Sequence, residues 1–357
     1  MSISISTYQV KAGDTLESVA EQLGISTEYL KRYHNTYCDL KNLIGTNLIG
    51  IHEIMLPPRE KIAEFKENQK QISARSNLPS VYLNKDFYAY NYEASERFEQ
   101  AGKEDLKVNY LVSIKSQELK DKGFVVEMKT SEFEKQDESP DDKISMLSLA
   151  CMESISPVAF SVPAQGKIKG FYDYQALVKK FESKRPDLES FFVGEINKNY
   201  IDKFGTSIKN EEYLLKQFCS SLLYQVLFPE MDWFRRQKEW EGKFYVIPNS
   251  FSVKCRFHTE HNFESSDDVE IFIGGKIEDD CSLQELLKGV KLEEPSENTI
   301  TGEIELRYTT SKETKRLKKI EASIILLHQE ELYLKHDLTL TEKEEKKIRK
   351  FSTLVEE

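Results

Sequence analysis

The spacing of apolar residues near the start of the chain predicts a short strand followed by a helix. Residues 8–11 read as a strand, and the next apolar positions recur at the spacing of one helix face. Asp14 and Glu17 have the spacing of a capping box, so we expect Asp14 to begin this helix. Gly24 is expected to end it, because glycine readily adopts the left-handed conformation of a helix C-cap.

A second helix and a second strand are expected to complete this part of the chain. Ser26 is a suitable cap for the second helix, and residues 53–56 return to a strand pattern. Pro57 and Pro58 cannot continue a β-ladder, so they mark a domain edge. The order of these segments predicts a small βααβ unit over residues 1–58.

The remaining sequence predicts a larger domain of a different texture. Residues 59–76 carry only a thin apolar stripe, which indicates an exposed linker helix. Within residues 77–357, strand-like alternation gives way to a helical period over about 173–240, and strands resume over about 244–340. A charged C-terminal helix is expected at 341–355. Strands, a helical insert and an antiparallel meander indicate the α+β class rather than a doubly wound parallel sheet.

Two local signals within the larger domain predict breaks in regular structure. Arg185-Pro186 is expected to end one helix before another begins at Asp187, because proline lacks the N–H that a helix interior needs. Gly274-Gly275, followed by Lys276, is expected to form a hairpin turn between two strands.

Composition and charge exclude some classes of partner. Hydrophobic residues make up 39% of the 357 residues, charged residues make up 31%, and the net charge is −11. Nucleic acids and anionic membranes are themselves negatively charged, so this balance argues against non-specific binding to either.

The first residues bear on localisation. No basic residue precedes Lys11, and Ser and Thr interrupt the apolar positions, whereas a secretory signal needs a basic start and an apolar run. No apolar run approaches the roughly twenty residues of a membrane span. We therefore expect a cytoplasmic protein without a membrane span, delivered elsewhere only by a non-classical secretion machine.

The cysteines are odd in number, far apart and without a CxxC pair, so we expect reduced and mostly buried thiols. They are Cys38, Cys151, Cys219, Cys255 and Cys281.

We expect neither a metal nor another cofactor. Cys255, His258, Glu260 and His261 lie close in sequence, but on a strand Cys255 faces the opposite side from His258 and Glu260. No second ligand pair completes a four-ligand site. Trp233, Phe234 and Trp240, interleaved with Arg235 and Arg236, are expected to lie in the core rather than on an exposed recognition surface.

Catalytic motifs are also lacking. The sequence has no HExxH and no GxxxxGK[ST], and the apolar neighbours of Cys151 and Cys219 indicate packing rather than nucleophilic catalysis. A lysozyme-like carboxylate pair stays open, because the 61 acidic residues offer many spacings. We expect no enzyme.

One segment resembles a known family. Residues from Tyr8 to Ser26 match Y-x-V-x-x-G-D-T-L-x-x-[VI]-A-x-x-x-G-[IV]-S, the signature of the LysM module. The resemblance covers Thr7–Pro57 and fades after Asn35, where a longer segment replaces the usual Pro-Gly turn. No second copy is present in the sequence.

The resemblance implies a βααβ fold and a shallow groove for N-acetylglucosamine-containing glycans such as peptidoglycan. Such modules bind the glycan between the loop after the first strand and the loop before the second. The second loop corresponds to Leu43–Gly50. The residues implied for binding a glycan or a protein partner are Gly13, Asp14, Thr15, Leu16, Ile44 and Gly45.

Three functions follow as hypotheses. The first is a non-catalytic binding or adaptor protein, a component or cargo adaptor of a bacterial contractile injection machine of the phage-tail or type VI secretion kind. The second is a peptidoglycan-targeted enzyme or effector with its active site in the larger domain. The third is a peptidoglycan-associated protein. Residues 59–357 resemble no family with a known function.

Overall fold

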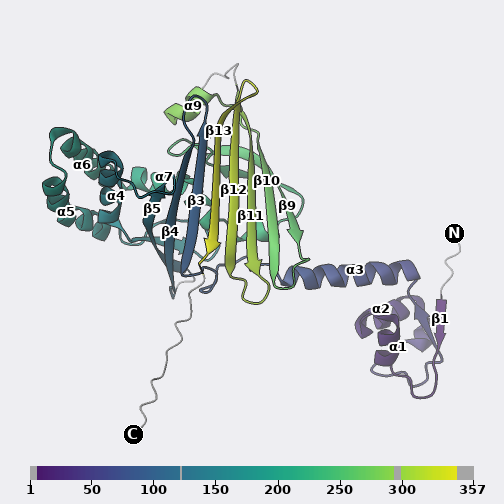
Figure 1. Ribbon diagram of the computed structural model, residues 1–357. Helices are drawn as coiled ribbons and strands as arrows, with labels where there is room; N and C mark the ends of the chain where they lie inside the picture. The colour runs from purple at the N-terminus through teal and green to yellow at the C-terminus, as the bar shows by residue number, and fades with distance from the viewer. Residues whose placement is uncertain (1–5, 121–122, 293–298, 344–357) are drawn as a thin grey trace, which may run out of the picture. The chain divides into compact units, whose positions relative to one another are not determined.

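The structure of the protein, a computed structural model, describes residues 6–120, 123–292 and 299–343. The chain divides into two units, Met1–Ser76 and Asn77–Glu357, each described here by itself (Figure 1).

The N-terminal unit has the order strand, helix, helix, strand, helix. Strands β1 and β2 pair antiparallel, with Tyr8 opposite Ile54. A short 3₁₀ helix, η1, follows the second α-helix. The elements are β1 (Ser6–Gln9), α1 (Leu16–Leu23), α2 (Thr27–Tyr37), η1 (Leu40–Asn42), β2 (Glu53–Leu56) and α3 (Arg59–Ser76).

The start of α1 differs from the sequence prediction. Thr15, not Asp14, is the N-cap: its side chain accepts the Ser18 N–H, and the Ser18 hydroxyl accepts the Thr15 N–H. Asp14 instead accepts hydrogen bonds from the N–H of Lys11 and the hydroxyl of Tyr8, both at 2.8 Å. The predicted Asp14–Glu17 capping box is therefore wrong, because Asp14 closes the turn that precedes the helix.

The other caps are as predicted. Gly24 ends α1 in the left-handed conformation, with φ of 65°, and its N–H reaches the carbonyls of Ala20 and Glu21. Ser26 caps α2 by accepting the N–H of Tyr29.

Two neighbouring residues of α2 hold the segment that leads to β2. His34 is buried; its Nδ1 accepts the N–H of Met55 at 3.0 Å, and its Nε2 lies 2.8 Å from the carbonyl oxygen of Asn42. Asn35 bonds both the N–H and the carbonyl of Ile44. This segment is therefore fixed by side chains rather than by a ladder.

Helix α3 occupies the range in which an exposed helix was predicted, and none of its residues is fully buried. Its Ile62 and Phe65 nevertheless pack on the apolar core of the N-terminal unit. The rings of Phe65 and Tyr29 stack with centroids 4.3 Å apart. The first half of this helix is therefore attached to the N-terminal unit and is not a free linker.

The large unit is built on an eleven-stranded sheet in which every pairing is antiparallel (Figure 1). The order is β7-β6-β5-β4-β3-β13-β12-β11-β10-β9-β8. The strands are β3 (Asn91–Gln100), β4 (Leu106–Glu118), β5 (Gly123–Lys135), β6 (Val158–Pro163), β7 (Gly170–Phe171), β8 (Glu239–Phe244), β9 (Val253–Asn262), β10 (Asp268–Ile277), β11 (Thr301–Ser311), β12 (Leu317–His328) and β13 (Glu331–Glu342).

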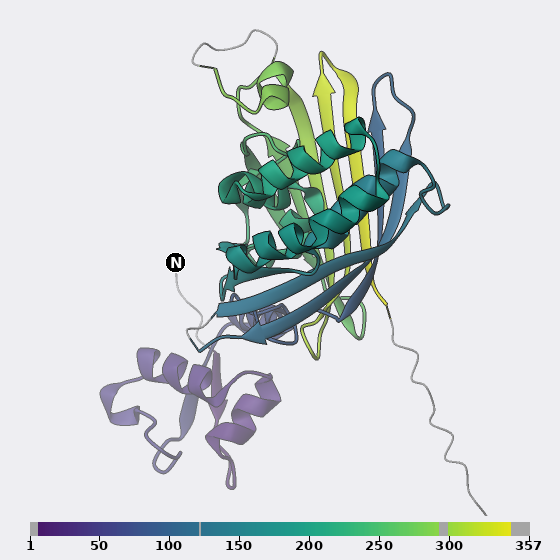
Figure 2. The ribbon, with the colours of Figure 1, turned by 90° about the vertical axis from the view of Figure 1, so that its left-hand side faces the viewer.

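Most helices of this unit lie between β5 and β8 in the sequence and pack against the concave face of the curved sheet (Figure 2). These helices are α4 (Lys143–Ile155), α5 (Tyr174–Phe191), α6 (Glu195–Ile208), α7 (Glu211–Ser220), α8 (Leu222–Leu227) and the 3₁₀ helix η2 (Met231–Arg235). One more helix, α9 (Leu283–Lys288), follows β10. Mixed helices and a large antiparallel sheet agree with the predicted α+β class.

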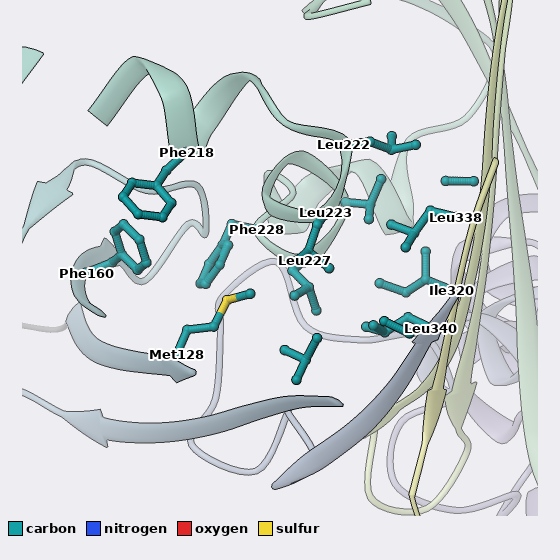
Figure 3. Close-up of a cluster of buried hydrophobic side chains, with 14 of the residues drawn as sticks. Met128, Phe160, Phe218, Leu222, Leu223, Leu227, Phe228, Ile320, Leu338 and Leu340 are labelled. Atoms are coloured by element: carbon teal, nitrogen blue, oxygen red, sulfur yellow. The ribbon is translucent and has the colours of Figure 1, made fainter. Parts of the chain in front are cut away.

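The core lies between these helices and the sheet (Figure 3). Leu223 and Leu227 of α8 point toward Leu338 and Leu340 on the sheet, and all four are buried. Burial of each such side chain contributes roughly 1.5–3 kcal/mol to stability. The buried hydroxyl of Tyr308 donates to the carbonyl of Val226 in α8 at 3.2 Å. The packing of α8 on the sheet therefore leaves neither of these two buried polar groups without a partner.

The predicted helix break at Arg185-Pro186 is wrong, because α5 continues through it. Proline removes only the bond to the carbonyl of Glu182. Phe181 and Leu188 are buried on either side of it, so packing outweighs the lost bond. Helix α4 had not been predicted, whereas α6 lies within the predicted helical insert of about 173–240.

The predicted hairpin turn at Gly274-Gly275 is also wrong, because both glycines lie inside β10. A Cβ atom added at Gly275 would lie 2.4 Å from the ring of Phe257, and one at Gly274 would lie 2.3 Å from the ring of His258. The glycines therefore allow two rings of β9 to lie across the neighbouring strand.

The predicted C-terminal helix 341–355 is corrected where the structure describes it. Thr341 and Glu342 belong to β13 and pair with β3. The rest of that predicted helix, from 344 onward, lies outside the described residues.

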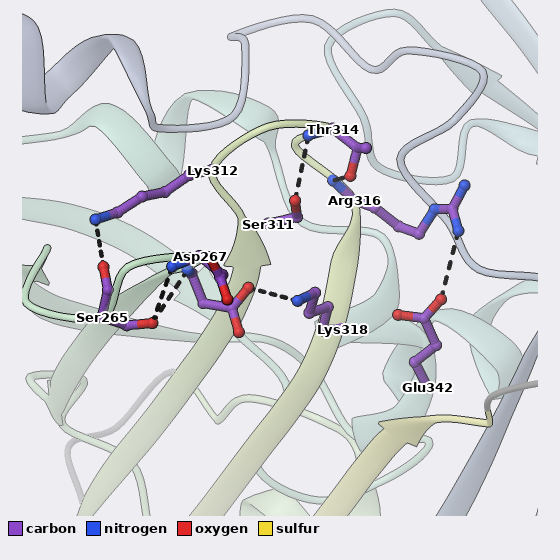
Figure 4. A network of polar contacts seen from close by, with 9 residues as sticks. Ser265, Asp267, Ser311, Lys312, Thr314, Arg316, Lys318 and Glu342 are labelled. Atoms are coloured by element: carbon purple, nitrogen blue, oxygen red, sulfur yellow. Dashed lines mark hydrogen bonds and ion pairs between the residues drawn. The ribbon is translucent and has the colours of Figure 1, made fainter.

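Polar contacts join two hairpins and the end of β13 (Figure 4). The N–H of Lys312, between β11 and β12, donates to the carbonyl of Asp267, between β9 and β10, at 2.7 Å. The Lys312 ammonium donates to the carbonyl of Phe263 at 2.8 Å. Arg316 lies 3.5 Å from Glu342. These contacts fix one end of the sheet.

Candidate functional site

The residues implied for binding by the N-terminal unit divide into an exposed and a buried group. Gly13, Thr15 and Gly45 are exposed. The side chains of Leu16 and Ile44 are 6% and 2% exposed and belong to the apolar core. Those two positions can meet a ligand only through neighbouring backbone.

Asp14 is half-buried and held in place by its two donors. The N–H of Lys11, and then the hydroxyl of Tyr8, lower the pKa of the Asp14 carboxyl below its ordinary value. The same hydrogen bond to Asp14 raises the pKa of Tyr8. Asp14 therefore orders the first loop as a carboxylate.

Exposed apolar side chains flank the second loop of this unit. Leu40 is 87% exposed, Leu43 is 46% exposed and Ile49 is 85% exposed. Leu40 and Ile49 were not among the predicted binding residues, although the sequence places Ile49 within Leu43–Gly50 and Leu40 just before it. Apolar side chains of this kind pack against a sugar face or an apolar protein surface.

The large unit has a groove of about 840 Å³ between α4 and α5, next to β5. This volume falls within the range of small-molecule sites, roughly 300–1,000 Å³. No part of it was predicted as a site, because the residues come from three separate elements. They are Lys129, Met146, Leu149, Ala150, Glu153, Ser154, Ser156, Pro157, Lys180, Lys184, Asp187, Leu188, Ser190, Phe191 and Phe192.

Cationic groups gather at one part of this groove. The ammonium of Lys180 donates to the carbonyl of Ser156, at the end of α4. Burial lowers the pKa of Lys180, and the nearby charge of Lys129 lowers it further, whereas Glu127 raises it. Within the described ranges, neither Lys129 nor Lys180 forms an ion pair with a carboxylate.

The cysteines considered for catalysis have the wrong environment for a nucleophile. Burial raises the pKa of Cys151 and of Cys219 to about 11 each, so both are thiols at neutral pH. Cys219 lines a cavity of about 200 Å³ together with Tyr224 and Phe228. Lys167 and Glu230 also line that cavity, and the charge of Lys167 offsets only part of the effect of burial on the pKa of Cys219.

The cluster considered for a metal is spread over two faces of β9. Cys255 is buried, and burial raises its pKa to about 12, whereas His258 is exposed. His261 lies 2.9 Å from the carbonyl of Phe234. In the part of the chain that the structure describes, no three potential metal ligands gather.

The aromatic residues next to the arginines lie in the core, as predicted. Trp233 is buried, and the Arg236 guanidinium lies 4.3 Å from the ring centre of Trp240. Arg235 donates to the carbonyls of Leu78 and Pro79 and so fixes the start of the large unit.

One buried polar cluster was not predicted. Glu96 accepts a hydrogen bond from the hydroxyl of Tyr110, and His336 Nε2 lies 2.7 Å from its other oxygen. Burial, followed by the charge of Glu96, raises the pKa of Tyr110 well above its ordinary value. The three residues come from β3, β4 and β13, which no local pattern brings together.

Within the described residues, no helix is both long and apolar enough to cross a membrane.

No family model and no curated protein matches the chain. Among solved structures, it is similar to lipovitellin from a structure titled for its lipid–protein interactions, at 7% identity and a TM-score of 0.37. The match covers 71% of this chain and 24% of that chain. A TM-score of this size does not establish a common fold.

Proposed function

We propose that this protein is a non-catalytic binding or adaptor protein, and that its N-terminal unit is a LysM module that docks it to an N-acetylglucosamine-containing glycan or to a protein partner. The observation that carries the proposal is the βααβ order of this unit together with the exposure of its two loops. Gly13 and Thr15 are exposed in the first loop, and Gly45 is exposed in the second.

The two loops favour different partners. The first keeps the residues of the module's signature, with Asp14 ordering the turn. The second carries Leu43 and Ile49 on the surface, which suits an apolar protein partner at least as well as a sugar. Docking to a component of a contractile injection machine is the setting that we propose for such a module.

The non-catalytic character is supported by the environment of the thiols. Burial disfavours the thiolate and so raises the pKa of the thiols of Cys151, Cys219 and Cys255. The alternative of a peptidoglycan-cleaving enzyme predicts release of soluble fragments when the intact protein is incubated with purified peptidoglycan. Such release would contradict the proposal.

Glycan docking is tested by sedimentation of the intact protein with purified peptidoglycan. Gly45→Arg is the informative variant, since Gly45 is exposed, has open space at its Cβ position and does not have a left-handed backbone. We expect wild type to sediment and Gly45→Arg to stay in the supernatant. Asn199→Arg, which adds the same charge to an exposed position of α6, should sediment like wild type.

Protein docking is tested by chemical crosslinking in the source cells, with mass spectrometry of the crosslinked residues. We expect crosslinks that map to the N-terminal unit and are lost in Leu40→Ser/Ile49→Ser, while Leu332→Ser, at an exposed position of β13, retains them. If neither peptidoglycan nor any protein contacts this unit, the proposed docking role is wrong.

A further inference from the structure

The groove between α4 and α5 differs in character from one end to the other. Lys180 and Phe191 both line it and lie on α5, eleven residues apart in the numbering. At 1.5 Å per residue, the two positions are roughly 16 Å apart along the helix axis. The groove is therefore long enough for an extended chain rather than a compact ligand.

The end near Lys180 is cationic and has unused hydrogen-bonding capacity. Lys129 of β5 is exposed there, and Lys180 uses one of its three donors on the carbonyl of Ser156. The hydroxyl oxygen of Ser156 is itself buried and has no hydrogen-bond partner among the described residues. Buried polar atoms rarely stay unpaired in proteins, so this end is suited to an anionic group.

The other end is apolar and open to solvent. Phe191 is 71% exposed and Met146 is 41% exposed, although both line the groove. Beyond Phe191, Val193 and Ile196 are 67% and 83% exposed. Single exposed apolar residues are common on proteins, but Phe191 and Met146 line the same groove, and exposed apolar side chains gathered in this way mark a binding surface.

The groove also carries carboxylates, which its lysines outnumber. Glu153, near the end of α4, lines the same end as Lys129 and Ser156, and the charge of Glu127 raises the pKa of Lys180. Asp187 also lines the groove, but on α5 it lies nearer to Phe191 than Lys180 does and so belongs to the apolar half. Three lysines against two lining carboxylates give a positive balance in a chain whose net charge is −11.

We propose that this groove binds a free single-chain amphiphile, with its anionic head at Lys129 and Lys180 and its apolar tail running toward Phe191. A long-chain carboxylate has this chemistry. Its head would replace the missing carboxylate partner of the two lysines, and its tail would cover apolar surface that is otherwise exposed to water. Binding of this kind does not depend on the proposed role of the N-terminal unit.

The test is isothermal titration of the intact protein with dodecanoate below its critical micelle concentration. We expect one dodecanoate per chain. Lys180→Met keeps the apolar stem but removes the charge, so affinity should fall roughly tenfold to a hundredfold, the range for losing a charged hydrogen bond. Lys129→Met should also weaken binding. Because Lys129 is exposed, this variant is expected to fold, so it tests the charge even if Lys180→Met misfolds. Phe191→Ser should also weaken binding.

Controls separate the site from general detergent binding. Lys198→Met, at an exposed position of α6, should bind dodecanoate like wild type. Hexanoate and dodecyl maltoside, which lack the tail length and the charge respectively, should bind at least tenfold more weakly. The proposal is overturned if dodecyl maltoside binds as well as dodecanoate, or if both lysine variants bind like wild type. Binding only to phosphatidylglycerol vesicles, without binding of free dodecanoate, would also overturn it.

Discussion

The N-terminal unit surrounds a small apolar cluster with side-chain hydrogen bonds, whereas the large unit surrounds one continuous core with long strands. His34 and Asn35 fix the segment before β2 by bonding its backbone. In the large unit, the backbone is held by strand pairing and by the packing of buried side chains such as Phe160 and Leu227. A small unit cannot bury enough surface to fix its loops by packing, so specific polar contacts take that role.

This comparison can be measured because both tryptophans of the chain, Trp233 and Trp240, belong to the large unit. Tryptophan fluorescence therefore reports the large unit alone. Hydrogen exchange of peptides from residues 6–76 reports the N-terminal unit.

The largest effect is expected from Phe160→Ala. Phe160 is fully buried and contacts the rings of Phe171, Phe218 and Tyr224. Truncation of a buried phenylalanine costs about 3–5 kcal/mol. The urea midpoint of tryptophan fluorescence should fall, while exchange in the N-terminal unit stays unchanged. A parallel loss of protection in both units would show that they unfold together.

Next is His34→Phe, which keeps a ring but removes both hydrogen bonds. The N–H of Met55 and the carbonyl of Asn42 lose their partner, at a cost of about 1–3 kcal/mol for each group that stays buried. Exchange should rise in the N-terminal unit, with no change in the fluorescence midpoint. His52→Phe, at an exposed position of the same unit, is the control and should leave exchange unchanged.

A third variant, Gly275→Ala, overpacks the sheet of the large unit. The added methyl group meets the buried ring of Phe257, which stacks on Trp240 at 4.6 Å, so a loss of about 1–3 kcal/mol and a shifted emission maximum are expected. Gly274→Ala should cost less, because His258 is exposed and can rotate away. Equal losses for the two variants would contradict this explanation.

The smallest effect is expected from Asp14→Asn. Because the pKa of Asp14 is lowered in the folded unit, its carboxylate stabilises that unit above the unfolded pKa of about 3.9. The contribution is lost as pH falls through the folded value. Wild type should therefore be more stable than the variant at neutral pH, and the difference should disappear in acid. Urea titrations followed by NMR of the Tyr8 and Lys11 amides, repeated at each pH, measure the stability difference between wild type and variant. A stability difference that does not change with pH would argue against an ionised Asp14.

The same contrast explains what the sequence could predict. Helix ends were predicted correctly where a single nearby residue suits the cap, as Gly24 does for α1 and Ser26 does for α2. The prediction was wrong where two adjacent residues both suit the N-cap: Thr15 caps α1, and Asp14 bonds Tyr8 instead. Alternation along β4 and β9 to β12 was visible because one face of each strand is buried.

Features that depend on distant residues were not predictable in this way. Pro186 stays inside α5 because of packing on both sides, and Gly274 stays inside β10, where the absence of a side chain leaves room for the ring of His258. The groove brings Lys129, Met146 and Lys180 together from three elements. The exposed loop residues of the N-terminal unit were only partly identified, because exposure of Leu40 and Ile49 depends on how the loop is held.

The pairing of β3 with β13 has a consequence for how the large unit forms. Leu338 pairs with Glu96, so the first and last strands of the unit meet in the middle of the sheet. During synthesis, β3 and β12 both present open edges until β13 emerges, because no earlier strand can join the two halves. Contacts between such distant parts of a chain slow folding, and open edges invite pairing with other chains. A ribosome-bound chain that stops before Glu331 is therefore expected to depend on chaperones in a way that the finished protein does not.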